Sequence, residues 1–195
     1  MPFTLTIEPD VRDDVDAREI ARRIRAMVRA LRLADEISFV LSDDDHVRAL
    51  NATYRGKDRT TDVLAFALEE GEFSSFRGSL LGDVIVSVPT AIRQARRARK
   101  APLEEITMLL AHGLLHLLGW DHDTKAKDRA MRAEVARLTR GASRPASRGA
   151  PARTTRVRNP SGKHGIAAVD GPRTRVFQGL CGGKGPRKPI KKAET

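Results

Sequence analysis

The fold of this chain is decided by the stretch His112-Gly113-Leu114-Leu115-His116-Leu117-Leu118-Gly119-Trp120-Asp121-His122. His112 and His116 are four residues apart, and because an α-helix advances about 100° per residue, both imidazoles lie on one helix face. Residues 108–118 are otherwise almost all apolar, which predicts a helix buried on every side. The two histidines then need polar partners, because burying an unpaired polar group costs roughly 2–7 kcal/mol.

A third histidine follows a predicted turn. Gly119 is expected to end the helix, since glycine adopts the left-handed conformation of helix C-termini without steric cost. The turn can bring His122, ten residues after His112, to the same point. Three neutral imidazoles and a water form an open tetrahedral site, which suits one catalytic Zn²⁺ ion. The alternative is three separately satisfied histidines, but their spacing around the glycine favours a shared metal site.

The residue after the first histidine distinguishes this motif from that of the metzincin proteases. Those enzymes share the histidine and glycine spacing but place a general-base glutamate where this chain has Gly113. Glycine inside a helix costs roughly 1 kcal/mol relative to alanine, so its presence needs a reason. We hypothesise that the missing side chain leaves room beside the metal for a bulky substrate group.

The composition limits the class of protein. The length of 195 residues suits one domain, or one domain with an appendage. No apolar run approaches the ~20 residues that span a bilayer, and the N-terminus lacks a basic-then-apolar signal pattern, so we expect a cytoplasmic protein with no membrane partner. The single cysteine, Cys181, cannot form an internal disulfide, which agrees with a reducing compartment.

The charge is distributed unevenly along the chain. The net charge is +11, but residues 141–195 hold 13 basic and 2 acidic residues, and residues 1–140 are balanced. The same tail contains 9 of the 15 glycines and 6 of the 10 prolines and has few large apolar residues. We therefore predict a folded domain over residues 1–140 and a disordered tail over residues 141–195. The tail either binds RNA nonspecifically or has no role.

Hydrophobic periodicity predicts the remaining elements. Ser42 and the three aspartates that follow it predict a helix start, with the hydroxyl as the cap. The sequence as a whole predicts an α+β fold of the zincin type, in which a small mixed sheet packs around the buried helix that carries the zinc ligands. The expected strands cover residues 3–7, 37–41, 63–66 and 80–88, and the expected helices cover residues 15–33, 43–50, 89–100, 102–118 and 124–138.

Two further regions contain candidate functional groups. In the polar stretch before residue 63, Arg55 and Lys57 are candidates to hold an anionic substrate, although this stretch resembles ordinary surface. Asp83 lies inside an apolar strand, where it either orients a zinc-bound histidine or accepts hydrogen bonds from backbone N–H groups. The basic residues of 93–100 are more simply a solvated helix face than a phosphate-binding surface.

The motif closely resembles the signature of the bacterial YbeY family, rRNA maturation factors regarded as zinc-dependent single-strand endoribonucleases. The segments 54–66 and Leu81-Gly82-Asp83-Val84 also resemble that family, so the resemblance covers roughly residues 1–140. It implies that His112, His116 and His122 are the metal ligands and that Arg55 is the family's functionally important arginine.

The chain departs from the family pattern at several positions. Thr60-Thr61 replaces a usual proline-threonine, Ala65 and Ala67 stand where serine and proline are common, and Trp120 stands where tyrosine is usual. These changes affect packing and loop shape more than chemistry. They raise the question of how rigid the loop is.

The resemblance implies phosphodiester cleavage in single-stranded RNA, with Arg55, His112 and His116 as catalytic residues. The implied role is maturation of the 3′ end of small-subunit rRNA and ribosome quality control, with ribosomal particles as partners. One alternative is a zincin-type metalloprotease, against which Gly113 argues because the catalytic glutamate is missing. The other is a noncatalytic ribosome-assembly factor whose zinc is structural.

Overall fold

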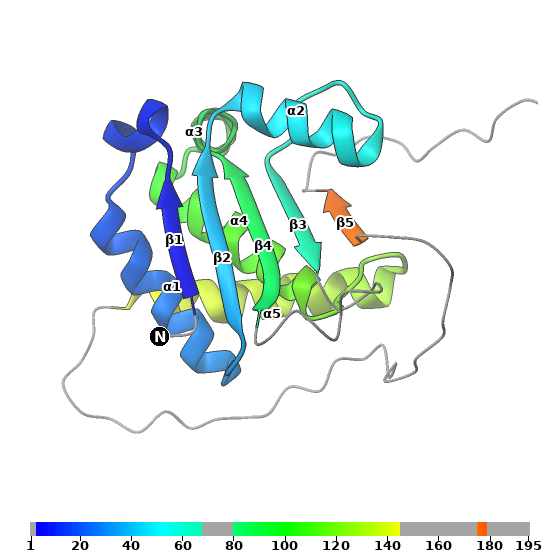
Figure 1. The fold of residues 1–195 in the computed structure, drawn as a ribbon. Helices are drawn as coiled ribbons and strands as arrows, with labels where there is room; N and C mark the ends of the chain where they lie inside the picture. The colour runs from blue at the N-terminus through cyan, green and yellow to red at the C-terminus, as the bar shows by residue number, and fades with distance from the viewer. Residues whose placement is uncertain (1–2, 68–79, 145–174, 179–195) are drawn as a thin grey trace, which may run out of the picture.

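The protein is built on a five-stranded sheet with the strand order β1-β2-β4-β3-β5 (Figure 1). The computed structural model describes residues 3–67, 80–144 and 175–178. The first three strands in this order are parallel, whereas β3 is antiparallel to both β4 and β5. The sheet is therefore mixed, as predicted. The strands are β1 (Phe3–Ile7), β2 (Glu36–Ser42), β3 (Val63–Ala67), β4 (Leu80–Ser87) and β5 (Arg175–Gln178).

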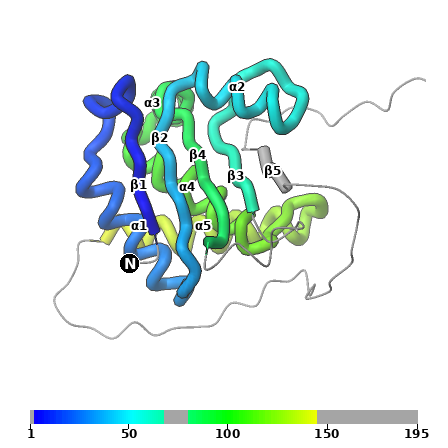
Figure 2. The backbone as a smooth tube through the Cα atoms, in the orientation of Figure 1, coloured from blue at the N-terminus to red at the C-terminus, as the bar shows by residue number. Residues whose placement is uncertain are grey.

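Helices cover the sheet unequally. Figure 1 and Figure 2 show α1, α4 and α5 behind the sheet, whereas α2 crosses its upper end. Among the helices that the structure describes, none combines the length and apolar composition that crossing a bilayer requires. The helices are α1 (Ala17–Leu31), α2 (Asp44–Arg55), α3 (Val88–Ala98), α4 (Pro102–Leu117) and α5 (Lys125–Ser143), preceded by the 3-10 helix η1 (Pro9–Asp14).

The central helix is α4, and it is buried as predicted. Leu109, Leu110, Leu114 and Leu115 have no exposed surface, and they belong to one core with the inward side chains of the strands. Burial of one leucine side chain contributes roughly 1.5–3 kcal/mol, so these residues fix α4 between the sheet and the outer helices. The histidines on this helix are consequently held by the core of the domain.

Some predicted boundaries differ from the structure. Ser42 is not the cap of α2, because Asp43 takes that position and its carboxylate accepts from the backbone N of His46 at 2.7 Å. The Ser42 hydroxyl instead donates to Glu8 at 2.5 Å. Ser42 and Asp43 can both cap a helix, but Ser42 is the last residue of β2, so Asp43 takes the cap position. The last helix runs past the expected end and stops at Ser143.

Within the predicted tail, Arg175–Gln178 form the short strand β5 along the edge of β3. An edge strand presents unpaired N–H and C=O groups that attract another extended segment. The rest of the tail, Cys181 and residues 68–79 lie outside the described residues.

Candidate metal centre

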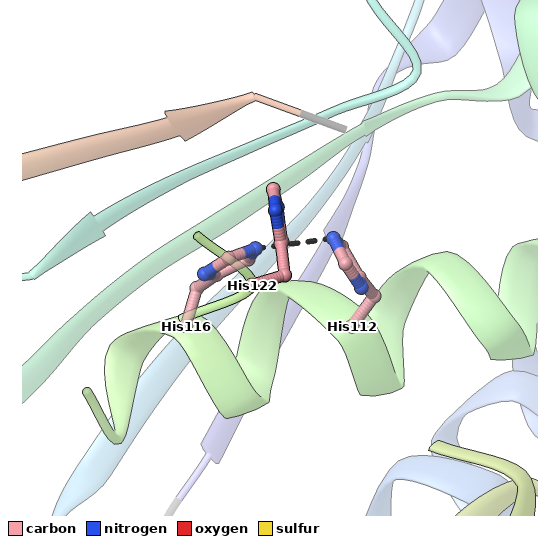
Figure 3. Close-up of side chains that lie close together, drawn as sticks. All are labelled: His112, His116 and His122. Carbon is pink, nitrogen blue, oxygen red and sulfur yellow. Dashed lines mark hydrogen bonds between the residues drawn. The ribbon is translucent and has the colours of Figure 1, made fainter. Parts of the chain in front are cut away.

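The structure brings all three predicted histidines together (Figure 3). His112 and His116 project from one face of α4, and their Nε2 atoms are 3.1 Å apart. The segment after the helix supplies His122, and one possible ligand atom from each ring lies within 4.8 Å of the other two. Such a cluster could bind a metal ion.

A backbone carbonyl orients the His116 ring. The Nδ1 atom of His116 lies 2.9 Å from the carbonyl oxygen of Trp120. Because a carbonyl can only accept, Nδ1 carries the proton and the lone pair is left on Nε2. That lone pair points at the same place as the Nε2 of His112, which is the arrangement of a metal-binding imidazole with a fixed tautomer.

The turn that delivers His122 forms as predicted. Gly119 has φ of 76°, in the left-handed region, and its backbone N donates to the His116 carbonyl at 2.9 Å. The Trp120 backbone N then donates to the Leu115 carbonyl at 3.0 Å, which turns the chain back over the helix end. His122 is exposed, so the site is buried on the helix side and open at its third donor.

Burial keeps the two helix histidines neutral. Burial, followed by the charge of His122, lowers the pKa of His112 to about 4. Burial, followed by the charge of His112, lowers the pKa of His116 to about 3. At neutral pH both rings are therefore unprotonated, as metal coordination requires.

These shifts predict that chelated, metal-free protein loses stability as the pH falls from about 6.5 toward about 4. The ordinary histidine pKa is 6.5, so in this range the unfolded chain binds more protons than the folded one. Each buried histidine then lowers the free energy of unfolding by up to about 1.4 kcal/mol per pH unit. Thermal unfolding followed across this range measures the effect.

The Glu19 carboxylate sets the lower limit of the pH range in which the histidines can be observed alone. Hydrogen bonds from Arg22 and then Arg23 lower the pKa of Glu19 from 4.5 to about 2, so its contribution to stability is lost only below pH 4.5. The interval from pH 6.5 to 4.5 therefore isolates the histidines from this ion pair. A melting temperature that stays level across that interval would contradict the assignment.

The hypothesis that Gly113 leaves room for substrate is wrong. A Cβ atom on Gly113 would lie 2.6 Å from Cγ1 of Val84 and 3.2 Å from Cγ2 of Val63. Both valines belong to the sheet, so the glycine lets α4 approach β3 and β4 closely. The missing side chain serves packing between helix and sheet.

Gly113→Ala is therefore expected to destabilise the protein by about 1–3 kcal/mol, the usual cost of overpacking a core. Urea unfolding at equilibrium measures the loss. Gly141→Ala is the matched control, because Gly141 lies in α5 and a Cβ there would meet nothing within 4 Å. That control is expected to gain up to about 1 kcal/mol from helix propensity. Equal stability of the two variants would exclude the packing explanation.

Arg55, the predicted substrate-binding arginine, is the last residue of α2. Its side chain is partly buried, and its Nε atom is fully buried without a hydrogen-bond partner among the described residues. Burial lowers the pKa of Arg55 to about 10, so the guanidinium remains charged at neutral pH. Its charge is among the causes that lower the pKa of His116, which places it within electrostatic reach of that ring.

The loop after Arg55 is held by Asn51, a residue that the sequence pattern did not single out. Asn51 is fully buried, and its side-chain Nδ2 donates to the Arg59 carbonyl at 2.7 Å. Its own backbone carbonyl accepts from the Lys57 backbone N at 3.3 Å. These two hydrogen bonds anchor the first part of the loop to α2. The only clue in the sequence was a polar residue on the inner side of an amphipathic helix.

The buried carboxylate near the histidines is Asp62, not Asp83. Val84 contacts the Gly113 position on α4, so its strand neighbour Asp83 faces the opposite side of the sheet. Asp83 therefore does not orient a histidine. Asp62 is fully buried, accepts from Gln94 Nε2 at 3.0 Å, and its charge acts to raise the pKa of His112 against the larger effect of burial.

The other basic candidates lie at the surface. Lys57 is exposed in the loop after α2. Arg93 is exposed and pairs with the Asp44 carboxylate at 2.8 Å, which ties α3 to the start of α2. The remaining basic residues of 96–100 are exposed, as expected for a solvated helix face.

Known proteins resemble both the sequence and the fold. A family model described as endoribonuclease YbeY matches residues 7–142. A relative of that name from Anaeromyxobacter sp. (strain Fw109-5) is 50% identical over 125 residues, which are 64% of this chain and 64% of that protein. A Geobacter sulfurreducens relative of the same name is 38% identical over 125 residues, which are 64% of this chain and 83% of that protein.

A solved structure shares the fold. The solution structure of TM1509 from Thermotoga maritima superposes with a TM-score of 0.53 at 21% identity, covering 72% of this chain and 88% of that one. The matched family model spans most of the folded domain, including the three histidines and Arg55. The chain therefore belongs to the endoribonuclease YbeY family.

Proposed function

We propose that this protein is a metal-dependent endoribonuclease that cleaves single-stranded RNA during rRNA maturation. The observation that carries the proposal is the pairing of three convergent imidazoles with a partly buried guanidinium whose Nε lacks a partner among the described residues. The first group can hold a metal ion, and the second is a ready site for a phosphate. Family membership supports this choice of reaction.

Zinc is the metal that suits these ligands best. His112 and His116 are neutral, His116 has a fixed tautomer, and no carboxylate belongs to the cluster that the described residues form. A set of three nitrogen donors with an open position is the pattern of catalytic zinc sites, whereas Mg²⁺ and Ca²⁺ prefer oxygen. Three donors on a buried helix and the turn after it also suit a zincin-type arrangement.

The protein's own residues supply the rest of the chemistry. An ion held by His112, His116 and His122 would supply Lewis acidity, which lowers the pKa of water and polarises a phosphoryl oxygen. Arg55 holds the phosphate and offsets the negative charge that grows in the transition state. The carbonyl of Trp120 keeps the His116 ring in place, and α4 keeps His112 beside it.

The two rival functions are less well supported. A metalloprotease with this spacing relies on a glutamate after the first histidine, and Gly113 here packs against Val84 with no space for one. A purely structural zinc would suit a closed site with four protein ligands, but the described cluster has three, and His122 is exposed.

The proposed activity also assigns the wider context. Small-subunit rRNA and ribosomal particles would be the partners, and the cytoplasm the compartment, because ribosomes mature there. Residues 1–140 would form the catalytic domain and residues 141–195 an appended segment. The chain matches 64% of the length of its Anaeromyxobacter relative, so the activity of the whole protein is part of this proposal.

One experiment tests the proposal directly. Purified protein is assayed for metal content and for cleavage of an unstructured RNA and of casein, before chelation, after chelation, and after Zn²⁺ is restored. We expect about one zinc per chain and RNA cleavage that chelation removes and zinc restores. Cleavage of casein alone, or RNA cleavage that survives complete metal removal, would overturn it.

A further inference from the structure

Tyr54 is an exposed aromatic residue beside the proposed phosphate site. Tyr54 is the one large hydrophobic residue among the described residues that is exposed, with a relative accessibility of 56%. It lies on the last turn of α2, immediately before Arg55. Folding gains little from a ring that stays in water, so its exposure is not explained by the core.

The ring of Tyr54 is nevertheless held in place. It packs against Phe66 with ring centroids 5.1 Å apart and an interplanar angle of 71°, an edge-to-face contact. Phe66 is itself 7% exposed and belongs to a small core cluster with Val47, Leu64 and Ile85. In an edge-to-face pair, at least one face of the tyrosine ring is directed away from its partner.

The backbone that carries Tyr54 and Arg55 is also ordered. Gly56 ends α2 with φ of 63°, and its backbone N donates to the Ala52 carbonyl at 3.0 Å. Consecutive residues of a helix have Cα atoms about 3.8 Å apart and point about 100° apart, so the Tyr54 ring and the Arg55 guanidinium lie on adjoining faces of the last turn of α2. An aromatic ring and a cation on adjoining faces of one helix turn can contact the base and the phosphate of one nucleotide.

We propose that Tyr54 stacks on an unpaired nucleobase of the RNA whose phosphate Arg55 holds. This inference rests on the proposed function and names how the substrate is recognised. Stacking on an aromatic ring tolerates any base, because every base has a π-face. It also favours single strands, since a base within a duplex already stacks on both of its neighbours.

The test measures KM and kcat separately for metal-loaded protein acting on a short unstructured RNA. Tyr54→Ala is expected to raise KM about 10-fold or more with little change in kcat, because stacking is present before and during the reaction. Tyr54→Phe keeps the aromatic face and is expected to behave like the unsubstituted protein. Tyr54→Phe keeps the contact with Phe66 and should unfold like the unsubstituted protein. Tyr54→Ala loses that contact, so a small drop in melting temperature is expected, and circular dichroism at the assay temperature checks that this variant is folded.

A set of RNAs, each with one abasic nucleotide, identifies the interaction. With the unsubstituted protein, removing the base that stacks on Tyr54 should raise KM about as much as Tyr54→Ala does. With Tyr54→Ala, removing that same base should have no further effect, because the contact is already lost.

The outcomes separate this inference from the proposed function. If the unsubstituted protein cleaves RNA and Tyr54→Ala has the same KM, the stacking role is wrong and the endoribonuclease stands. The stacking role is also wrong if every abasic position affects both proteins equally. If the unsubstituted protein does not cleave RNA at all, the proposed function itself has failed.

Discussion

His116→Ala is expected to abolish stoichiometric metal binding and to reduce RNA cleavage by at least about 100-fold, because weaker changes around metal ligands already cost 10–100-fold. The ring contributes a nitrogen that lies 3.1 Å from the Nε2 of His112 and is fixed by the Trp120 carbonyl. Two remaining imidazoles, one of them exposed, are too few to retain zinc. Metal analysis after gel filtration and a cleavage assay with unstructured RNA measure both effects.

His46→Ala is the matched control for this substitution. His46 is exposed on α2 and contacts Glu8 outside the histidine cluster. It should keep full metal content and full cleavage. Circular dichroism decides whether His116→Ala is still folded, since a catalytic site predicts a folded protein without activity. A folded His116→Ala variant with normal metal content would remove this residue from the centre.

Arg55→Ala is expected to lower RNA cleavage about 100- to 1000-fold while metal content stays unchanged. Removal of one donor that stabilises transition-state charge usually costs ~2.7–4 kcal/mol, which corresponds to this range. Because the Nε atom of Arg55 is buried without a partner among the described residues, the substitution should leave stability unchanged or raise it. Loss of activity together with a gain or no change in melting temperature is the expected pattern.

Arg48→Ala is the control for Arg55→Ala. Arg48 lies on the same helix, but it is exposed and pairs with Asp58 at 2.6 Å, and surface pairs of this kind contribute little. It should retain full activity. If Arg48→Ala and Arg55→Ala reduce cleavage equally, the effect comes from total charge on α2 and not from a specific phosphate contact.

The main elements of the fold could be predicted because their apolar residues recur at a single period. The helix that carries His112 and His116 was evident from its continuous apolar residues, and the turn after it from Gly119. The 3-10 helix η1 and the strand β5 were missed, since short elements show too few repeats to establish a period. The cap of α2 was misplaced by one residue because Ser42 and Asp43 can both accept from free N–H groups.

The sequence predicted those parts of the site that depend on the spacing of residues close together in the chain. The offset of four residues was enough to place two histidines on one face. The sequence left two roles open for Asp83 because alternation along a strand does not say which face meets which helix, and the structure excludes the role of orienting a histidine. The contacts of Asn51 and Asp62 join segments that are brought together only by folding, so the sequence pattern gave little sign of them.

The hydrogen bond from His116 goes to the main-chain oxygen of Trp120. The orientation of the His116 ring therefore does not depend on which side chain stands at position 120. Trp120 is 6% exposed and belongs to the core, so its indole contributes by packing. Another aromatic residue can therefore replace Trp120 while His116 keeps its tautomer and ring orientation. The side chain at position 120 is constrained by the volume it fills in the core, and the backbone at position 120 is constrained by its hydrogen bond to His116. A change in the side chain can therefore leave the backbone contact intact.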